Sequence, residues 1–141
     1  MNSSTTTTVK HSGLAVHSKE WPAPRILIID DDPIFCRIMA AIGDKVGVIV
    51  EFRASLRELY RALPNLSFDA AIVDYDLGRV TGVQISQHLQ RIYGGKPVVL
   101  VSNYKNIPLE GWSPSVRRFV SKGSGEQEIL RQALLCIAAH Y

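Results

Sequence analysis

Short apolar runs alternate along the chain with longer segments in which apolar positions recur every three or four residues. Runs such as Ile26-Leu27-Ile28-Ile29 are typical of strands buried on both faces of a sheet. The longer segments have the spacing of amphipathic helices. The pattern predicts an α/β fold, with a parallel sheet that carries helices on both faces. We expect strands at 25–30, 48–52, 69–74, 97–102 and 117–121, and helices at 33–45, 55–63, 83–93 and 127–139.

The connection between the fourth and fifth strands departs from this rhythm. Residues 103–116 contain Pro108 and Pro114, which leave space for little more than one or two helical turns. We therefore expect the fourth helix to be short, distorted or absent. Tyr104 and Trp112 in this segment either contact a partner or seal the core where the helix is missing. We prefer the core-sealing interpretation.

Composition places the chain among ordinary globular domains. It has 141 residues, of which 46% are apolar and 21% charged. No apolar run approaches the roughly 20 residues of a membrane-spanning helix, so we expect a cytoplasmic protein without membrane contact. Residues 1–24 are rich in Ser and Thr and end with two prolines, which indicates a flexible N-terminal extension. The folded domain is then expected over 25–141.

Charge and cysteine content narrow the function classes further. The chain has 16 Lys and Arg against 13 Asp and Glu, and this mild excess is spread along it. Nucleic-acid surfaces usually show a denser basic stripe or a recognisable reading module, so we do not expect nucleic-acid binding. Cys36 and Cys136 fall in expected helices without metal-type spacing, and we interpret them as packing residues.

Three carboxylates, Asp30, Asp31 and Asp32, follow the first expected strand directly. Open α/β sheets bind ligands at the carboxyl ends of their strands. Adjacent carboxylates repel one another unless a cation neutralises them, and Mg2+ takes oxygen ligands. Helix capping is the alternative, because Pro33 suits the first helical turn and Asp suits the N-cap. Taken alone, the triplet leaves both interpretations open.

Other strand ends bring polar residues to the same edge of the sheet. Asp74 ends the third strand, Ser102 the fourth and Lys122 the fifth. A carboxylate can accept a phosphoryl group, and hydroxyl and ammonium groups can hold its oxygens. Each residue also has a structural explanation, as a turn former, a cap or a solvated cation. Their joint placement favours phosphoryl chemistry assisted by Mg2+.

These residues together resemble the receiver domain of two-component response regulators. The resemblance covers about residues 25–140 and implies a flavodoxin-like, doubly wound, five-stranded parallel sheet with strand order 2-1-3-4-5. It rests on Ile-Leu-Ile-Ile-Asp-Asp-Asp-Pro at 26–33, Ala-Ile-Val-Asp-Tyr-Asp-Leu-Gly-Arg-Val-Thr-Gly at 71–82, Val-Val-Leu-Val-Ser at 98–102 and Arg-Phe-Val-Ser-Lys at 118–122.

The resemblance assigns roles to the acidic residues. It makes Asp74 the phosphoacceptor and implies that Mg2+ is held by Asp30, Asp31 and Asp74. We expect Asp31 to be a direct ligand and Asp30 to act through water. Asp32 is expected to start the helix instead of joining the site.

The resemblance also implies a switch and a set of partners. Ser102 and Lys122 would hold the phosphoryl oxygens, and Phe119 would follow Ser102 inward after phosphorylation. An ordinary edge position is the alternative for Phe119. Gly82 matches the glycine that closes the loop after the phosphorylation site.

The implied phosphodonor is a histidine kinase or a histidine phosphotransfer protein, and the downstream target is a protein of unknown identity. A homodimer is compatible with the family, although the altered segment before the fifth strand argues against the usual dimer geometry.

Four positions differ from the common receiver pattern. Gly123 stands where a proline usually follows the lysine, so we expect a more flexible loop there. Gly78 also replaces a frequent proline. Asn103 replaces a small residue and is expected to narrow access to the site. Asp76, two residues past the acceptor, is expected to modulate the lifetime of the phosphoryl group.

Two other functions compete with this interpretation. A receiver-like module could bind partners without phosphorylation, since Asn103, Gly123 and the altered fourth helix depart from the family. Asp74-Tyr75-Asp76 also resembles the nucleophile motif of haloacid-dehalogenase-type phosphatases, but there the motif normally ends the first strand of the core. We therefore expect a signalling domain that is not an enzyme.

Overall fold

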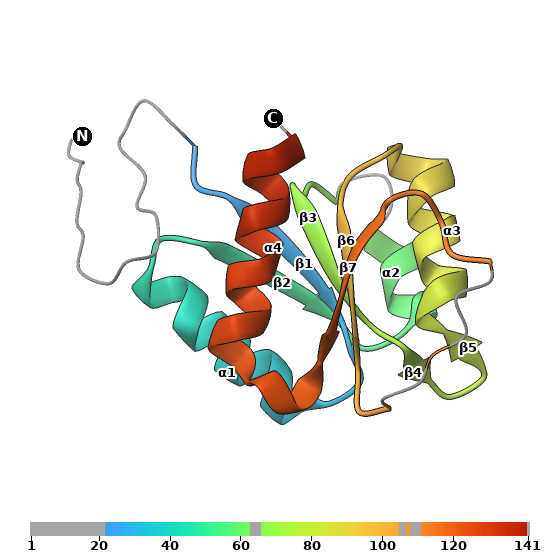
Figure 1. Cartoon of the computed structure of the whole chain (residues 1–141), viewed down its shortest axis with the longest axis horizontal. Helices are drawn as coiled ribbons and strands as arrows, with labels where there is room; N and C mark the ends of the chain where they lie inside the picture. The colour runs from blue at the N-terminus through green and yellow to red at the C-terminus, as the bar shows by residue number, and fades with distance from the viewer. Residues whose placement is uncertain (1–21, 63–65, 105–106, 108–110, 141) are drawn as a thin grey trace.

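The computed structural model describes residues 22–62, 66–104, 107 and 111–140 (Figure 1). The expected N-terminal extension, 1–24, lies outside the described residues except for its last three. Five parallel strands form one sheet in the order β2-β1-β3-β6-β7. This order confirms the expected topology, because β6 and β7 are the fourth and fifth strands of that sheet. They are β1 (Arg25–Ile29), β2 (Ile49–Arg53), β3 (Ala70–Asp74), β6 (Val98–Ser102) and β7 (Val116–Ser121).

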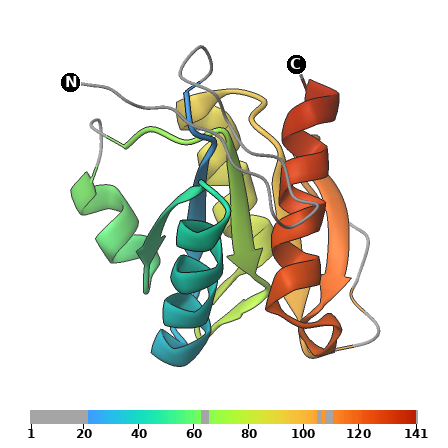
Figure 2. The same ribbon diagram turned by 90° about the vertical axis from the view of Figure 1, so that its left-hand side faces the viewer.

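In the described part of the chain, four α-helices flank the sheet, two on each face, as the pattern predicts for a doubly wound fold. Helices α1 and α4 cover one face, and α2 and α3 cover the other (Figures 1 and 2). None of the described helices is both long and apolar enough to cross a membrane. The helices are α1 (Pro33–Lys45), α2 (Leu56–Ala62), α3 (Gly82–Tyr93) and α4 (Glu126–His140), and a short 3-10 helix, η1 (Lys122–Ser124), follows β7.

The strand residues alternate between two hydrophobic cores. In β1, Ile26 and Ile28 pack with α1 and α4, whereas Leu27 and Ile29 pack with α2 and α3. Each of these four side chains is at most 1% exposed. Burial on both faces explains why the inner strands are continuous apolar runs and not alternating ones.

A small hairpin follows β3 and was not expected from the sequence. It pairs β4 (Asp76–Leu77) with β5 (Val80–Thr81) in antiparallel fashion. Its two-residue loop begins with Gly78, whose φ of +77° suits a hairpin turn that needs a positive φ at its first position. Strands of two residues give almost no apolar periodicity, which is why the pattern does not reveal them.

No helix is present between β6 and β7 in the described part of that connection, as expected. Residues 105–106 and 108–110 of it lie outside the described residues. Trp112 is half-buried and packs among the apolar side chains on the α2 and α3 face of the sheet. The centres of the Trp112 and Phe119 rings are 6.1 Å apart. It therefore seals the core as predicted. The same prediction is wrong for Tyr104, which is 54% exposed.

Candidate functional site

The carboxyl edge of the sheet collects the predicted site residues. Asp30 directly follows β1, Asp74 and Ser102 end β3 and β6, and Lys122 directly follows β7. Parallel pairing of these strands places their ends together. Asp30, Asp74 and Ser102 are buried, with exposed fractions of 2%, 8% and 1%.

Three carboxylates at this edge fit a divalent cation. One oxygen from each of Asp30, Asp31 and Asp74 lies within 4.8 Å of the others. Asp31 is exposed, so its carboxylate can reach an ion that retains several water molecules. Mg2+ prefers oxygen ligands and completes its coordination with water molecules. The predicted metal residues are therefore close enough together to hold one ion.

Lys122 balances part of this negative charge. Its Nζ lies 2.9 Å from Asp30 Oδ2 and 3.8 Å from Asp74 Oδ2. The ammonium also lies 4.8 Å from the centre of the Phe35 ring, a favourable cation–π position. Burial disfavours the charged form, but the interactions with Asp30 and Asp74 outweigh it and raise the pKa of Lys122. Lys122 is thus a fixed cation at the acidic cluster.

The Asp74 carboxyl ionises less readily in this environment than an ordinary aspartate does. Burial, followed by the negative charge of Asp30, raises the pKa of the Asp74 carboxyl to about 6. Lys122 and the Asp76 N–H, which donates to Asp74 Oδ1 at 3.3 Å, act in the opposite direction. A divalent cation would favour the ionised form.

The first two members of the acidic triplet have separate roles from the third. Asp32 is the N-cap of α1, and its Oδ1 accepts hydrogen bonds from the N–H groups of Ile34 and Phe35 at 3.0 and 3.3 Å. Its own N–H donates to Asp30 Oδ1 at 2.9 Å. The capping interpretation is therefore confirmed for Asp32, and the metal interpretation stays a prediction for Asp30 and Asp31.

The site opens into a polar cleft of about 460 Å3. Asp31 and Asp74 lie in it, and the two residues expected to modulate the chemistry, Asp76 and Asn103, are exposed and line it. The full lining among the described residues is Asp31, Asp74, Asp76, Gly78, Asn103, Tyr104 and Lys122.

Tyr104 is a site residue that the sequence interpretation missed. Its hydroxyl donates to Asp76 Oδ2 at 3.2 Å, and its N–H donates to Ser102 Oγ at 2.9 Å. Its ring meets that of Tyr75 edge to face at 6.5 Å. The available signal was its position two residues after Ser102, which matches that of Asp76 after Asp74.

The predicted switch residues lie on neighbouring strands. Ser102 pairs with Ser121 in the sheet, two residues beyond Phe119. Phe119 is half-buried, with its ring against Trp112. The Ser102 hydroxyl accepts a hydrogen bond from the Tyr104 N–H at 2.9 Å, so a movement of Ser102 would affect this contact. The switching roles themselves stay predictions.

Two glycines shape the loops of the site. A Cβ on Gly82 would lie 2.6 Å from the carbonyl oxygen of Asp74, so only glycine lets α3 begin this close to the acceptor. Gly123, in the place of the usual proline, is the middle residue of the 3-10 turn after β7 and donates its N–H to Ser121 Oγ at 3.1 Å. Proline could not make that hydrogen bond.

Comparisons with known proteins agree with this geometry. A family model described as the response regulator receiver domain matches residues 26–134. The transcriptional regulatory protein GlrR of Escherichia coli (strain K12) is 26% identical over 83 residues, which make up 59% of this chain and 19% of GlrR. The transcriptional regulatory protein QseF of Escherichia coli O157:H7 has the same identity, 26% over 83 residues, and these make up 59% of this chain and 19% of QseF. The chain thus spans about a fifth of the length of these curated relatives.

Solved receiver domains share the fold. A receiver domain protein from Methanospirillum hungatei superposes with a TM-score of 0.71 at 20% identity, over 83% of this chain and 95% of that one. TrrA from Thermotoga maritima, solved in complex with Mg(2+)-BeF, superposes with a TM-score of 0.69 at 16% identity, over 80% of this chain and 98% of TrrA. A Burkholderia pseudomallei response regulator with a phosphorylated aspartic acid and a calcium ion superposes with a TM-score of 0.70 at 18% identity, over 82% of this chain and 69% of that one. The family model and the strand order of the sheet point to the same family. The chain belongs to the response regulator receiver domain family.

Proposed function

We propose that the protein is a phosphoacceptor that carries a signal through phosphorylation of Asp74. The observation that supports this most strongly is the position of the Asp74 carboxylate. It shares a cation-sized cluster with Asp30 and Asp31, lies 3.8 Å from the Lys122 ammonium, and opens into a cleft. A nucleophile, a cation site and a fixed positive charge are the parts that phosphoryl transfer to a carboxylate requires.

In the proposed reaction a carboxylate oxygen of Asp74 attacks the phosphorus atom of a phosphohistidine. The new O–P bond forms while the P–N bond breaks, and the imidazole nitrogen keeps the electron pair of the broken bond. The product is an aspartyl phosphate. Lys122, already beside both Asp30 and Asp74, would stabilise the negative charge that develops on the phosphoryl oxygens.

Asp30, Asp31 and Asp74 would hold the metal ion. When bound, Mg2+ would neutralise phosphoryl charge and further favour the ionised form of Asp74. Two structural neighbours support this proposal, since TrrA was solved in complex with Mg(2+)-BeF and the Burkholderia pseudomallei regulator with a phosphorylated aspartic acid. In this chain Ser102 would then move toward the phosphoryl group and draw Tyr104 and Phe119 with it.

The proposed phosphodonor is a histidine kinase or a histidine phosphotransfer protein in the cytoplasm. Helix α1 begins at the site and exposes Ile34 and Ile38, which are 61% and 40% exposed and one helical turn apart. Apolar side chains in that position would give a donor helix a contact surface beside Asp74. The output would be contact with a further protein and not turnover of a small substrate.

The direct test is the intact mass of the protein after incubation with acetyl phosphate and Mg2+. We expect the mass of one phosphoryl group on the wild type, and none on Asp74→Asn or without Mg2+. The phosphorylation-independent alternative is favoured by the exposed Tyr104 and Asn103 side chains that line the cleft. A wild-type protein that gains no mass would support that alternative.

A further inference from the structure

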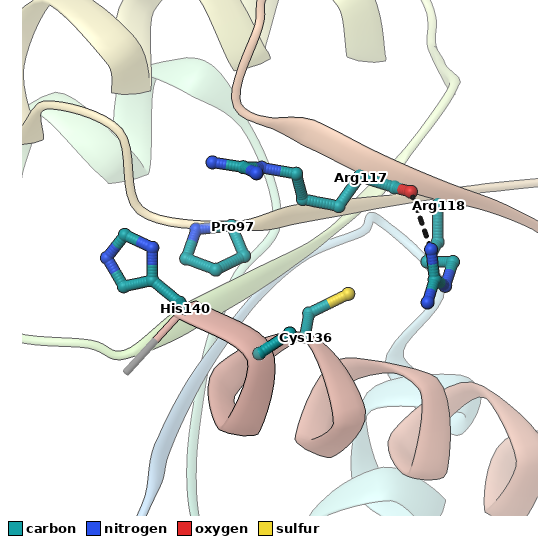
Figure 3. A pocket seen from close by; sticks show the side chains of 6 residues that line it. Pro97, Arg117, Arg118, Cys136 and His140 are labelled. Atoms are coloured by element: carbon teal, nitrogen blue, oxygen red, sulfur yellow. Dashed lines mark hydrogen bonds between the residues drawn. The ribbon is translucent and has the colours of Figure 1, made fainter.

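A second cleft lies at the opposite edge of the sheet from Asp74, between β7 and the end of α4. Its volume is about 150 Å3. It brings together two guanidinium groups and an imidazole, and no carboxylate among the described residues lines it. The lining consists of Pro97, Arg117, Arg118, Cys136, Ala139 and His140 (Figure 3).

An irregularity in β7 brings both arginines to this cleft. Val98 pairs with Val116, but Val99 pairs with Arg118, so Arg117 is an extra residue in the strand. Consecutive strand residues normally point to opposite faces of a sheet. A bulge interrupts this alternation and redirects side chains. Arg117 and Arg118 consequently line the same cleft.

The positive charge of the cleft is not neutralised by the rest of the described chain. Neither arginine forms an ion pair with a described carboxylate. Arg118 is held in place by its Nε, which donates to Gln132 Oε1 at 3.3 Å, and by a second hydrogen bond to the Arg117 carbonyl oxygen (Figure 3). Burial raises the pKa of the Cys136 thiol, and the charges of Arg118 and Arg117 oppose that rise. Both charges therefore act on the interior of the cleft.

We propose that this cleft binds a single phosphate group. Guanidinium groups bind phosphate oxygens through paired hydrogen bonds, and Arg117 and Arg118 both line this one small space. Pockets for drug-sized ligands measure about 300–1,000 Å3, so this cleft has room for a phosphate group and little more. The alternative role for Arg117 and Arg118 is to keep the edge strand β7 from pairing with another chain, as charged side chains on edge strands do. That role does not require a bulge that places both arginines at the same cleft.

The site is independent of the proposed phosphorylation of Asp74, and its affinity is expected to be modest. The negative end of the α4 dipole lies nearby and opposes an anion. We would titrate isotope-labelled protein with sodium phosphate in the absence of Mg2+, at constant ionic strength, and follow the backbone amide resonances. Saturable shifts are expected at residues 116–118 and 136–140, opposite the acidic site.

Five variants make the test specific. Arg117→Ala and Arg118→Ala should each weaken phosphate binding about tenfold, the effect of losing one charge-assisted hydrogen bond. Arg57→Ala removes an exposed arginine from α2 on the other face of the sheet and should leave the affinity unchanged. Ala139→Glu places a carboxylate in the cleft and should abolish binding, whereas Ala139→Gln should retain it.

A parallel titration with O-phosphoserine distinguishes free phosphate from a phosphate monoester as the natural ligand. Binding of either compound with the expected dependence on Arg117 and Arg118 supports the proposal. Shifts that do not saturate, that weaken equally in Arg57→Ala, or that centre on Lys122 would show an adventitious ion only and would overturn it.

Discussion

The Tyr104 hydroxyl donates a hydrogen bond to Asp76 Oδ2 at 3.2 Å and thereby joins the segment after β6 to the hairpin after β3. Both residues line the cleft that contains Asp74. The Tyr104 N–H is also bonded to Ser102 Oγ, the hydroxyl expected to move on phosphorylation. Tyr104 therefore links the entrance of the cleft to the proposed switch.

Loss of the Tyr104 side chain should expose the phosphoryl group to water. We expect Tyr104→Ala to shorten the half-life of the phosphorylated protein about fivefold, and Tyr104→Phe, which keeps the ring, to shorten it less. The half-life would be followed by intact mass after removal of acetyl phosphate. Tyr60→Phe is the matched control, because Tyr60 is also exposed and its hydroxyl bonds to His88, away from the cleft. Equal half-lives in all four proteins would show that Tyr104 does not protect the site.

Asp76→Asn should lengthen the lifetime of the phosphoryl group. Asp76 Oδ1 accepts from the Gly78 N–H and Oδ2 from Tyr104, so both oxygens are already engaged and poorly placed to orient an attacking water. The remaining effect of Asp76 is repulsion of the phosphoryl oxygens by its charge. Asparagine keeps an acceptor for Tyr104 and removes that charge. We expect a half-life about threefold longer in the same assay; an unchanged or shorter half-life would count against repulsion.

The stability of the metal-free protein should depend on the ionisation of Asp74. Its folded-state pKa of about 6 lies above the ordinary value of 3.8, so the folded state binds this proton more tightly than the unfolded chain. The stabilisation from Asp74 is complete below about pH 4 and is lost as the pH rises through 6. By the conversion of pKa into free energy, that loss is on the order of 3 kcal/mol.

Asp74→Asn removes this proton and should remove the corresponding pH dependence. We expect the variant to be more stable than the wild type at pH 8 and of similar stability at pH 4, in urea unfolding with a chelator present. Mg2+ should stabilise the wild type more than the variant, since it binds the folded carboxylate cluster. Parallel stability curves for the two proteins would contradict the assigned environment of Asp74.

Gly82→Ala should destabilise the fold next to the site. The added Cβ would lie 2.6 Å from the Asp74 carbonyl oxygen and 2.9 Å from Tyr75 Cα, and a backbone contact of that kind cannot be relieved by a side-chain rotation. We expect a loss of about 3 kcal/mol in urea unfolding. Gly95→Ala is the control, because a Cβ there would meet nothing within 4 Å and is expected to change stability little.

Much of the fold could be predicted because the sheet is buried on both faces. Strands such as Ile26–Ile29 must then be continuous apolar runs, and their ends place Asp30, Asp74, Ser102 and Lys122 at one edge by parallel topology alone. The residue types at those ends indicated the chemistry.

The parts that were missed depend on contacts that leave no periodic signal. The β4–β5 hairpin is too short for a pattern and rests on one positive φ at Gly78. The position of Tyr104 depends on where the connection after β6 runs, and prolines in that connection indicate only that a helix is absent. The bulge at Arg117 depends on strand pairing, which a single sequence does not show.

The central claim is that Asp74 is the residue that accepts the phosphoryl group. Treatment with acetyl phosphate and Mg2+, followed by borohydride, converts an aspartyl phosphate into homoserine, which peptide mass spectrometry can locate. We predict homoserine at position 74 in the wild type, and none when Mg2+ is omitted. Homoserine at Asp30, Asp31 or Asp76 instead, or at no residue, would contradict the account.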